Sequence, residues 1–164
     1  MPKIIENVRE ELLAETKRQI GDRGYAKTTI RSVADACGIG VGTVYNYFPT
    51  KDILVATAVS LDWQEELDKM ASLPNDNPKL LLGGIFNSLR SFANKNRSLF
   101  SDVDVTQVIS TTYSTHHKYL RTQIANCILP LCQACELENA DFTAEYLAEA
   151  LICWSIENRD FEEV

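Results

Sequence analysis

Five side chains able to hydrogen-bond to another molecule lie close together just before position 52. Thr43, Tyr45, Asn46 and Tyr47 occur in a run without any charged residue, and Lys51 follows four positions later. Amide and hydroxyl groups can pair with the edges of nucleic-acid bases, whereas hydroxyl and ammonium groups donate hydrogen bonds to phosphate oxygens. No glycine-rich phosphate loop or pair of carboxylates for acid–base chemistry accompanies them. This chemistry indicates binding of a nucleic acid.

The segment that must position these side chains, residues 28–52, is typical of two short helices joined by a glycine turn. The hydroxyl of Thr28 or Thr29 can cap the first helix. Gly38 stands where that helix must end in a left-handed backbone, which only glycine adopts at low cost. Pro49 ends the second helix because it forces Phe48 out of the helical region. The pattern predicts a helix-turn-helix over Ile30–Phe48, followed by a helix that Thr50 caps.

The apolar residues of this segment are spaced to form one small core. Those of the first helix recur three or four positions apart, and we expect Val44 and Tyr47 to extend the same apolar face from the second helix. The expected core residues of the first helix and the turn are Ile30, Val33, Ala34, Cys37 and Ile39.

The order of residues from Gly24 to Asp52 closely resembles that of the tetracycline-repressor (TetR) family of transcriptional regulators. The motifs that carry the resemblance are Gly24-Tyr25, Thr28-Thr29-Ile30, Val33-Ala34, Cys37-Gly38-Ile39 and the run GTVYNYFPTKD at positions 42–52. The resemblance covers about the first 60 residues; beyond them only the expected helical architecture matches. One departure is Gly40-Val41, where many members have a polar pair, so base contacts at Val41 would be apolar.

This resemblance implies an all-α fold in two domains. Residues 1–50 would form a three-helix, helix-turn-helix DNA-binding domain, and residues 51–164 a helical domain for effector binding and dimerisation, joined by a long helix from Lys51. Family members usually end in two helices that pair across a twofold axis. The chain ends soon after what resembles a helix start at Asp160, so we expect the last helix to be missing or truncated.

The resemblance assigns DNA-contact roles to Thr29, Thr43, Tyr45, Tyr47 and Lys51. Residue chemistry adds Thr28, Arg31, Val41, Gly42 and Asn46. Gly42 would let the backbone approach the groove, and Asn46 would pair with adenine or a phosphate. Tyr45 is expected to anchor a phosphate, while packing in the core and phosphate contact remain equal alternatives for Tyr47.

The second domain is expected to hold a pocket for an amphipathic or apolar small molecule. The family resemblance is the main basis for this expectation, and packing in the core is the alternative for each of its candidate aromatic residues. These candidates are Trp63, Phe86, Phe92, Phe100, Tyr113, His116, His117 and Tyr119. A helix over residues 141–157 should have a core side formed by Phe142, Tyr146, Leu147, Ala150, Leu151 and Trp154, and its Phe142, Leu147 and Leu151 are expected at the dimer interface.

Composition favours a cytoplasmic helical protein without a membrane span, cofactor or metal. Of 164 residues 45% are hydrophobic, no apolar run approaches about 18 residues, and the charged N-terminus is not that of a signal peptide. The net charge of −7 arises after residue 60, because residues 1–60 hold eight Lys or Arg against seven Asp or Glu. The five cysteines fit a reducing compartment, and small buried thiols explain Cys127, Cys132 and Cys135 better than a zinc site does.

The leading hypothesis is therefore a homodimeric regulator, most simply a repressor that a small effector releases from a palindromic operator in double-stranded DNA. The first alternative is a constitutive or corepressor-dependent DNA-binding regulator without an inducing ligand. A remote alternative is a small enzyme using a Cys–His pair such as Cys127 and His117. The expectation is that the protein is not an enzyme.

Overall fold

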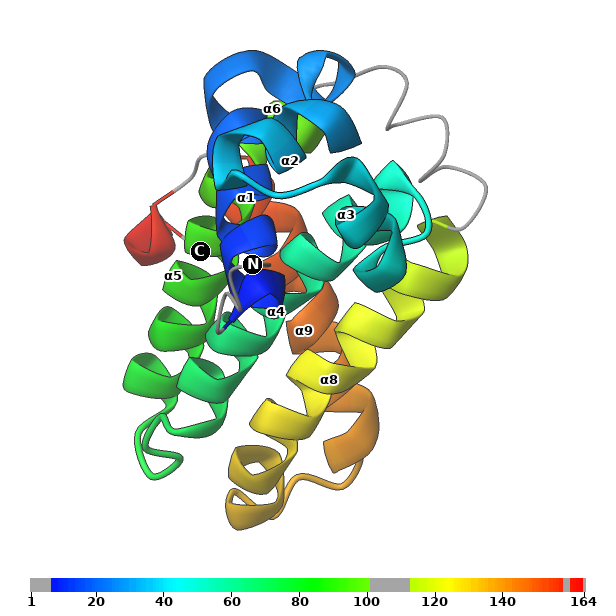
Figure 1. Ribbon diagram of the computed structural model, residues 1–164. Helices are drawn as coiled ribbons and strands as arrows, with labels where there is room; N and C mark the ends of the chain where they lie inside the picture. Colours follow the sequence, from blue (N-terminus) through cyan, green and yellow to red (C-terminus); the bar gives the residue numbers. More distant parts are fainter. Residues whose placement is uncertain (1–6, 101–112, 158–159, 164) are drawn as a thin grey trace. The chain divides into compact units, whose positions relative to one another are not determined.

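The computed structural model describes residues 7–100, 113–157 and 160–163, and every regular element within them is a helix (Figure 1). The predicted all-α fold is confirmed. Packing divides the chain into two compact units. The first contains the residues up to Asp62 and the segment that begins at Asn96, and the second contains residues 63–95 and the chain from Val108 onward. The division falls within a helix, after residue 62, whereas the boundary expected from the sequence was after residue 50.

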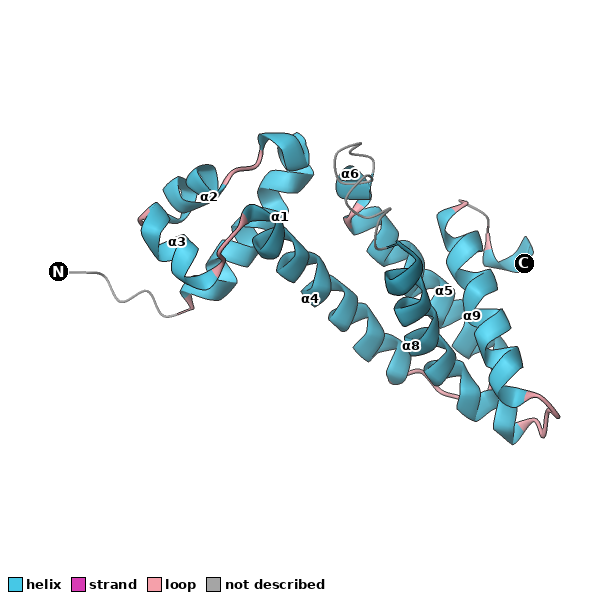
Figure 2. Ribbon diagram, turned by 90° about the vertical axis from the view of Figure 1, so that its right-hand side faces the viewer, coloured by secondary structure: helices cyan, strands magenta, loops and turns pink. Residues whose placement is uncertain are grey.

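Three helices, α1 (Val8–Lys27), α2 (Ile30–Cys37) and α3 (Val41–Tyr47), enclose the core of the first unit together with the start of α4 (Lys51–Ala71) (Figure 2). Gly24 interrupts α1 with a φ of 82°. The short α6 (Arg97–Phe100) packs against α1. The buried residues of this core are Leu12, Leu13, Ile30, Val33, Ala34, Val44, Phe48, Leu54 and Ala58.

The corner between α2 and α3 has the predicted chemistry. Thr29, and not Thr28, caps α2: its hydroxyl accepts from the Ser32 amide at 3.0 Å, and the Ser32 hydroxyl accepts from the Thr29 amide in return. Gly38 ends the helix with a φ of 68°, and the Ile39 amide donates to the Ala34 carbonyl. These bonds satisfy backbone groups at both ends of α2 and fix the direction in which the chain enters α3.

Helix α4 contributes to both cores. Its Leu54 and Ala58 lie in the core of the first unit, whereas Trp63 and Met70 lie in that of the second. The Thr50 hydroxyl accepts from the Ile53 amide at 3.2 Å, so the predicted cap of this helix is confirmed. In the first unit, the Lys17 ammonium bonds to the Asp62 carboxylate and ties α1 to α4.

The second unit consists mainly of the end of α4 with α5 (Pro78–Lys95), α8 (Tyr113–Ala134) and α9 (Ala140–Ile156), which pack against one another (Figure 2). Helix α8 contains Pro130 within its length. The chain after Asp160 forms a 3₁₀ turn, η1 (Phe161–Glu163), and Phe161 packs on Phe86 of α5. A Cβ atom on Gly83 would lie 3.1 Å from Phe161, so close packing explains this glycine.

The prediction of which α9 side chains face the core is partly wrong. Phe142 is 71% exposed and Tyr146 64% exposed, whereas Ala144 and Ala148 are almost fully buried. Small alanines let α9 approach its neighbours closely, which large aromatic side chains would prevent. Leu151 is buried as expected.

A buried carboxylate joins α4 to α5 within the second unit. Glu66 is 1% exposed and accepts from the Lys95 ammonium at 2.8 Å, the Lys69 ammonium at 2.9 Å and the Ser91 hydroxyl at 3.1 Å. Burial by itself would raise the pKa of Glu66. The three hydrogen bonds outweigh burial and lower this pKa to about 2.

We therefore predict an acid-sensitive contribution of Glu66 to the free energy of unfolding. The ionised form is stabilised in the folded state, so this contribution is complete above about pH 4.5 and is lost as the pH falls towards about 2. Glu66→Gln should lower the stability at pH 7 by about 1–3 kcal/mol and reduce the loss between these pH values, as measured by urea unfolding. The exposed neighbour Glu65 provides the control Glu65→Gln. Equal effects of the two variants would contradict the assignment.

Candidate nucleic-acid interface

Helix α3 exposes nearly all of its side chains. Val44 is its only buried residue, and Val41 is half-buried against the same core. Thr43 and Asn46 reach solvent, and Tyr45 and Tyr47 are 50% and 47% exposed. The neighbouring Phe48, 2% exposed, occupies the core position expected for Tyr47. The packing alternative for Tyr47 is therefore wrong, and both tyrosines present their rings at the surface.

Gly42 has no role in the packing of the part of the chain that the structure describes. It is exposed within α3, and a Cβ atom added there would meet no other atom within 4 Å. A glycine inside a helix costs about 1 kcal/mol relative to alanine. Since neither a positive φ nor a close internal contact requires it, this glycine is consistent with a molecule approaching the helix from outside.

The two threonines before α2 differ in whether their side chains are exposed and can contact another molecule. Thr28 is 1% exposed and its hydroxyl donates to the Gly24 carbonyl at 2.9 Å, so the expected DNA contact through this side chain is wrong. Thr29 is exposed, although its hydroxyl already serves the helix cap. Arg31, two positions later, is exposed.

Lys51 lies half-buried at the start of α4, where it contacts the end of α1. Its ammonium donates to the Tyr25 carbonyl at 2.6 Å and lies 3.7 Å from the centroid of the Tyr25 ring. The Tyr25 hydroxyl in turn donates to the Asp52 carboxylate. This lysine therefore braces α1 against α4, a role that the sequence did not indicate.

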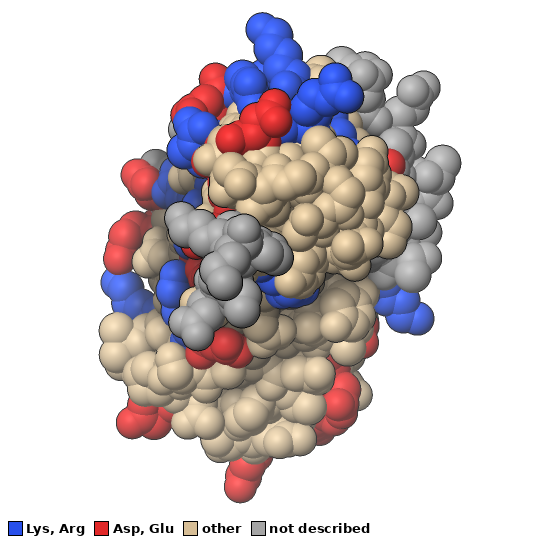
Figure 3. All heavy atoms as spheres, in the orientation of Figure 1, with Lys and Arg blue, Asp and Glu red and all other residues tan. Residues whose placement is uncertain are grey.

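Helix α3 carries no charged side chain. No Lys, Arg, Asp or Glu occurs from Ala36 to Thr50, and Figure 3 shows an uncharged area over α3, with Lys and Arg gathered over the end of α1 and the start of α2. In that segment Arg23, Lys27 and Arg31 are exposed. An uncharged surface with cations on one neighbouring side, which also carries the exposed Asp22 and Asp35, suits a partner with a polar interior and anionic edges.

The aromatic residues expected to line a pocket do not gather around one in the described residues. Trp63 and Phe86 are core residues; the Trp63 ring nitrogen donates to the Gln123 side chain at 2.8 Å, and Phe92 packs edge-on against Trp63. Tyr119 is 61% exposed. The side chains of Phe100, Tyr113 and His116 lie outside the described residues.

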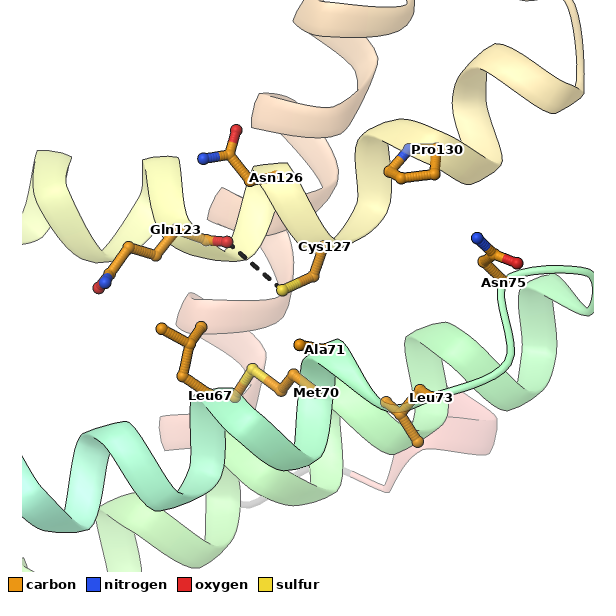
Figure 4. Close-up of a pocket in the computed structure, with 9 residues that line it drawn as sticks. All are labelled: Leu67, Met70, Ala71, Leu73, Asn75, Gln123, Asn126, Cys127 and Pro130. Atoms are coloured by element: carbon orange, nitrogen blue, oxygen red, sulfur yellow. Dashed lines mark hydrogen bonds between the residues drawn. The ribbon is translucent and has the colours of Figure 1, made fainter.

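A groove of about 440 Å³ instead lies between the end of α4, the α4–α5 connection and α8 (Figure 4). Figure 4 shows Leu67, Met70 and Ala71 of α4 opposite Gln123 and Cys127 of α8. None of its lining residues is charged, and none belongs to the predicted set. The remaining lining residues are Leu73, Asn75, Asn126 and Pro130.

Cys127 and His117 do not form a reactive pair. His117 lies 2.9 Å from the Glu149 carboxylate, whereas the Cys127 thiol donates to the Gln123 carbonyl at 3.5 Å. Ten residues of α8 separate His117 from Cys127, about 15 Å along a helix. Burial raises the pKa values of Cys127 and Cys132, which disfavours the reactive thiolate. Within the described residues no group of three or more potential metal ligands occurs.

No helix among the described segments combines the length and apolar character needed to cross a bilayer.

Comparison with known proteins identifies the first unit. Residues 12–58 match the family model of bacterial regulatory proteins, tetR family. Over 57 residues the chain is 39% identical to the HTH-type transcriptional repressor KstR2 of Mycolicibacterium smegmatis, covering 34% of this chain and 28% of that protein. The matched region thus spans less than a third of this curated relative.

The fold is shared over nearly the whole chain. The TetR family repressor AlkX from Dietzia sp. is similar with a TM-score of 0.60 and 21% identity, covering 93% of this chain and 85% of that one. The fatty acid degradation regulator FadR from Bacillus halodurans gives a TM-score of 0.60 and 17% identity, covering 94% and 88%. TetR family proteins are transcription factors and not enzymes. Residues 12–58 therefore carry the helix-turn-helix of the TetR family of transcriptional regulators, within a chain whose helical fold is similar to that of solved TetR-like regulators.

Proposed function

We propose that the chain acts as a homodimer that binds a near-palindromic operator in double-stranded DNA, with α3 in the major groove. The observation that carries this proposal is the exposure of α3. The capped and glycine-terminated α2 positions a helix whose only buried side chain is Val44. In helix-turn-helix proteins the second helix enters the groove, and the first crosses the backbone.

Individual roles follow from chemistry and exposure. Thr43 and Asn46 would contact base edges, and Gly42 would allow the helix to approach them. Tyr45 and Tyr47 would donate their hydroxyls to phosphates on either side. Arg31, with Arg23 and Lys27, would supply the positive charge that α3 lacks.

Dimerisation is proposed through α9. On α9 the exposed residues Phe142, Tyr146, Cys153 and Ile156 recur three, four or seven positions apart, which puts them on one side of the helix. Phe142 and Tyr146 also stack on each other, with centroids 6.5 Å apart. Glu149 lies on the same side and pairs with His117 and Arg121 of α8. A second copy would cover this largely apolar stripe around it and hold two α3 helices about 34 Å apart. Leu151 belongs to the subunit's own core, so the expected interface should centre on Phe142 and Tyr146.

An effector is proposed for the groove between α4 and α8. Its volume lies in the range of about 300–1,000 Å³ found for small-molecule sites. Apolar side chains of α4 and the amides of Asn75, Gln123 and Asn126 suit an uncharged, amphipathic molecule. Since α4 also contributes Leu54 to the core of the first unit, a shift of this helix on ligand binding could release the operator.

A regulator without an inducing ligand is the second candidate, because the groove is not lined by the expected aromatic residues. The two candidates differ in the effect of ligand on operator affinity. We predict that the purified chain binds its operator without added ligand and that medium-chain alcohols or amides, which are uncharged, weaken this binding. Affinity unchanged by these compounds would favour constitutive binding, and affinity that requires them would favour a corepressor.

The role of Gly42 gives a direct test of the DNA-binding proposal. Gly42→Ala should raise stability by about 0.5–1 kcal/mol and lower affinity at least tenfold for the duplex that the wild type enriches from a random library. The control Gly21→Ala changes a second exposed glycine, in α1, whose added Cβ also meets nothing within 4 Å. It should raise stability without weakening DNA binding. Unchanged affinity in the Gly42 variant would contradict the proposed approach of α3 to the groove.

The proposed dimer interface predicts that a substitution at one surface position changes the oligomeric state. Tyr146→Glu would bury a charge at the proposed contact and should convert the dimer to a monomer in sedimentation experiments, with its helical content retained. Leu80→Glu alters another large exposed apolar residue, 57% exposed on α5, and should leave the dimer intact. If both variants remain dimeric, the partner subunit contacts another surface.

A further inference from the structure

The outward face of α3 can be defined from the position of its one buried residue. Successive residues of an α-helix are rotated by about 100°. Gly42 and Asn46 each lie two positions from Val44 and therefore point about 160° away from the core, whereas Thr43 and Tyr45 flank them at about 100°. Asn46 and the bare backbone at Gly42 consequently occupy the centre of the exposed face.

The chemistry used most often to recognise G·C base pairs is absent from this face. Guanine presents two acceptors that are usually bound by Arg or Lys, and the cytosine amino group is bound by Asp or Glu. The segment from Ala36 to Thr50 contains none of these residues. The nearest cations lie on other helices: Arg31 is at the start of α2, and the Lys51 ammonium contacts the Tyr25 carbonyl and ring.

The groups that are present match an A·T base pair. A side-chain amide forms two hydrogen bonds with adenine, and apolar groups contact the thymine methyl. Asn46 supplies the amide at the centre of the face, and the exposed Thr43 supplies a methyl group beside it. Half-buried Val41 adds apolar surface at the start of the helix.

From this arrangement we infer that α3 selects A·T base pairs at the centre of each operator half-site, with Asn46 on adenine and the Thr43 methyl on a thymine. This inference rests on the proposed DNA-binding function and specifies its partner. Cations outside α3 contact phosphates and contribute affinity that is independent of sequence. The expected discrimination is about tenfold for each base pair contacted.

The first experiment selects duplexes from a random library with the full-length chain and its Asn46→Ala variant. The wild type should enrich an inverted repeat with A·T pairs fixed at symmetry-related positions. Asn46→Ala should weaken the preference for adenine at one position in each half-site. Asn87→Ala, at an exposed asparagine of α5, is the control and should enrich the wild-type sequence. Enrichment of G·C pairs at the half-site centres would overturn the inference and leave the proposed function standing. Failure to enrich any duplex would overturn both.

The second experiment removes single thymine methyl groups from the selected duplex by replacing thymine with deoxyuracil. At one position per half-site this change should weaken wild-type binding several-fold. Thr43→Ser keeps the hydroxyl and lacks the methyl, so the same replacement should no longer affect its binding, as a double-mutant cycle will show. Replacement effects that are equal in the wild type and Thr43→Ser would overturn the assignment of Thr43 to thymine.

Discussion

The corner between α2 and α3 is the constraint on which the account depends. Thr29 and Ser32 bond to each other's backbone at the start of α2, and Gly38 turns the chain at its end. The short α3 then needs only Val44 to hold it against the core, since Phe48 is buried immediately after it. Because so little of α3 is used for packing, the rest of its surface is available to bind another molecule.

Helix α4 places a physical link between the two functions proposed for the chain. Its first half packs with α1–α3, and its second half lines the groove and carries Glu66, whose ion pairs join α4 to α5. An effector in the groove would contact the same helix whose start completes the core beneath α3. Coupling therefore requires only that this helix have two preferred positions, which ligand and DNA favour differently.

Local patterns predicted the first unit better than the second. Thr29, Gly38 and Pro49 located the ends of α2 and α3, because helix caps and left-handed turns depend on few neighbouring residues. The choice between Thr28 and Thr29 as the cap, and the choice between packing and phosphate contact for Tyr47, depended on the tertiary core and were not settled by spacing. On α9, large aromatic residues suggested the wrong buried side, because close helix packing selected Ala144 and Ala148. The groove residues carry no motif, so only the folded arrangement of α4 and α8 reveals them.

Hydrogen–deuterium exchange of the full-length chain, with and without the selected duplex, tests the central claim most directly. The account predicts that DNA slows exchange of the backbone amides of α3 and of the first turn of α2, while the exposed side of α5 exchanges as before. Slowed exchange confined to the second unit, with α3 unaffected at saturating DNA, would contradict the assignment of α3 as the DNA-recognition helix.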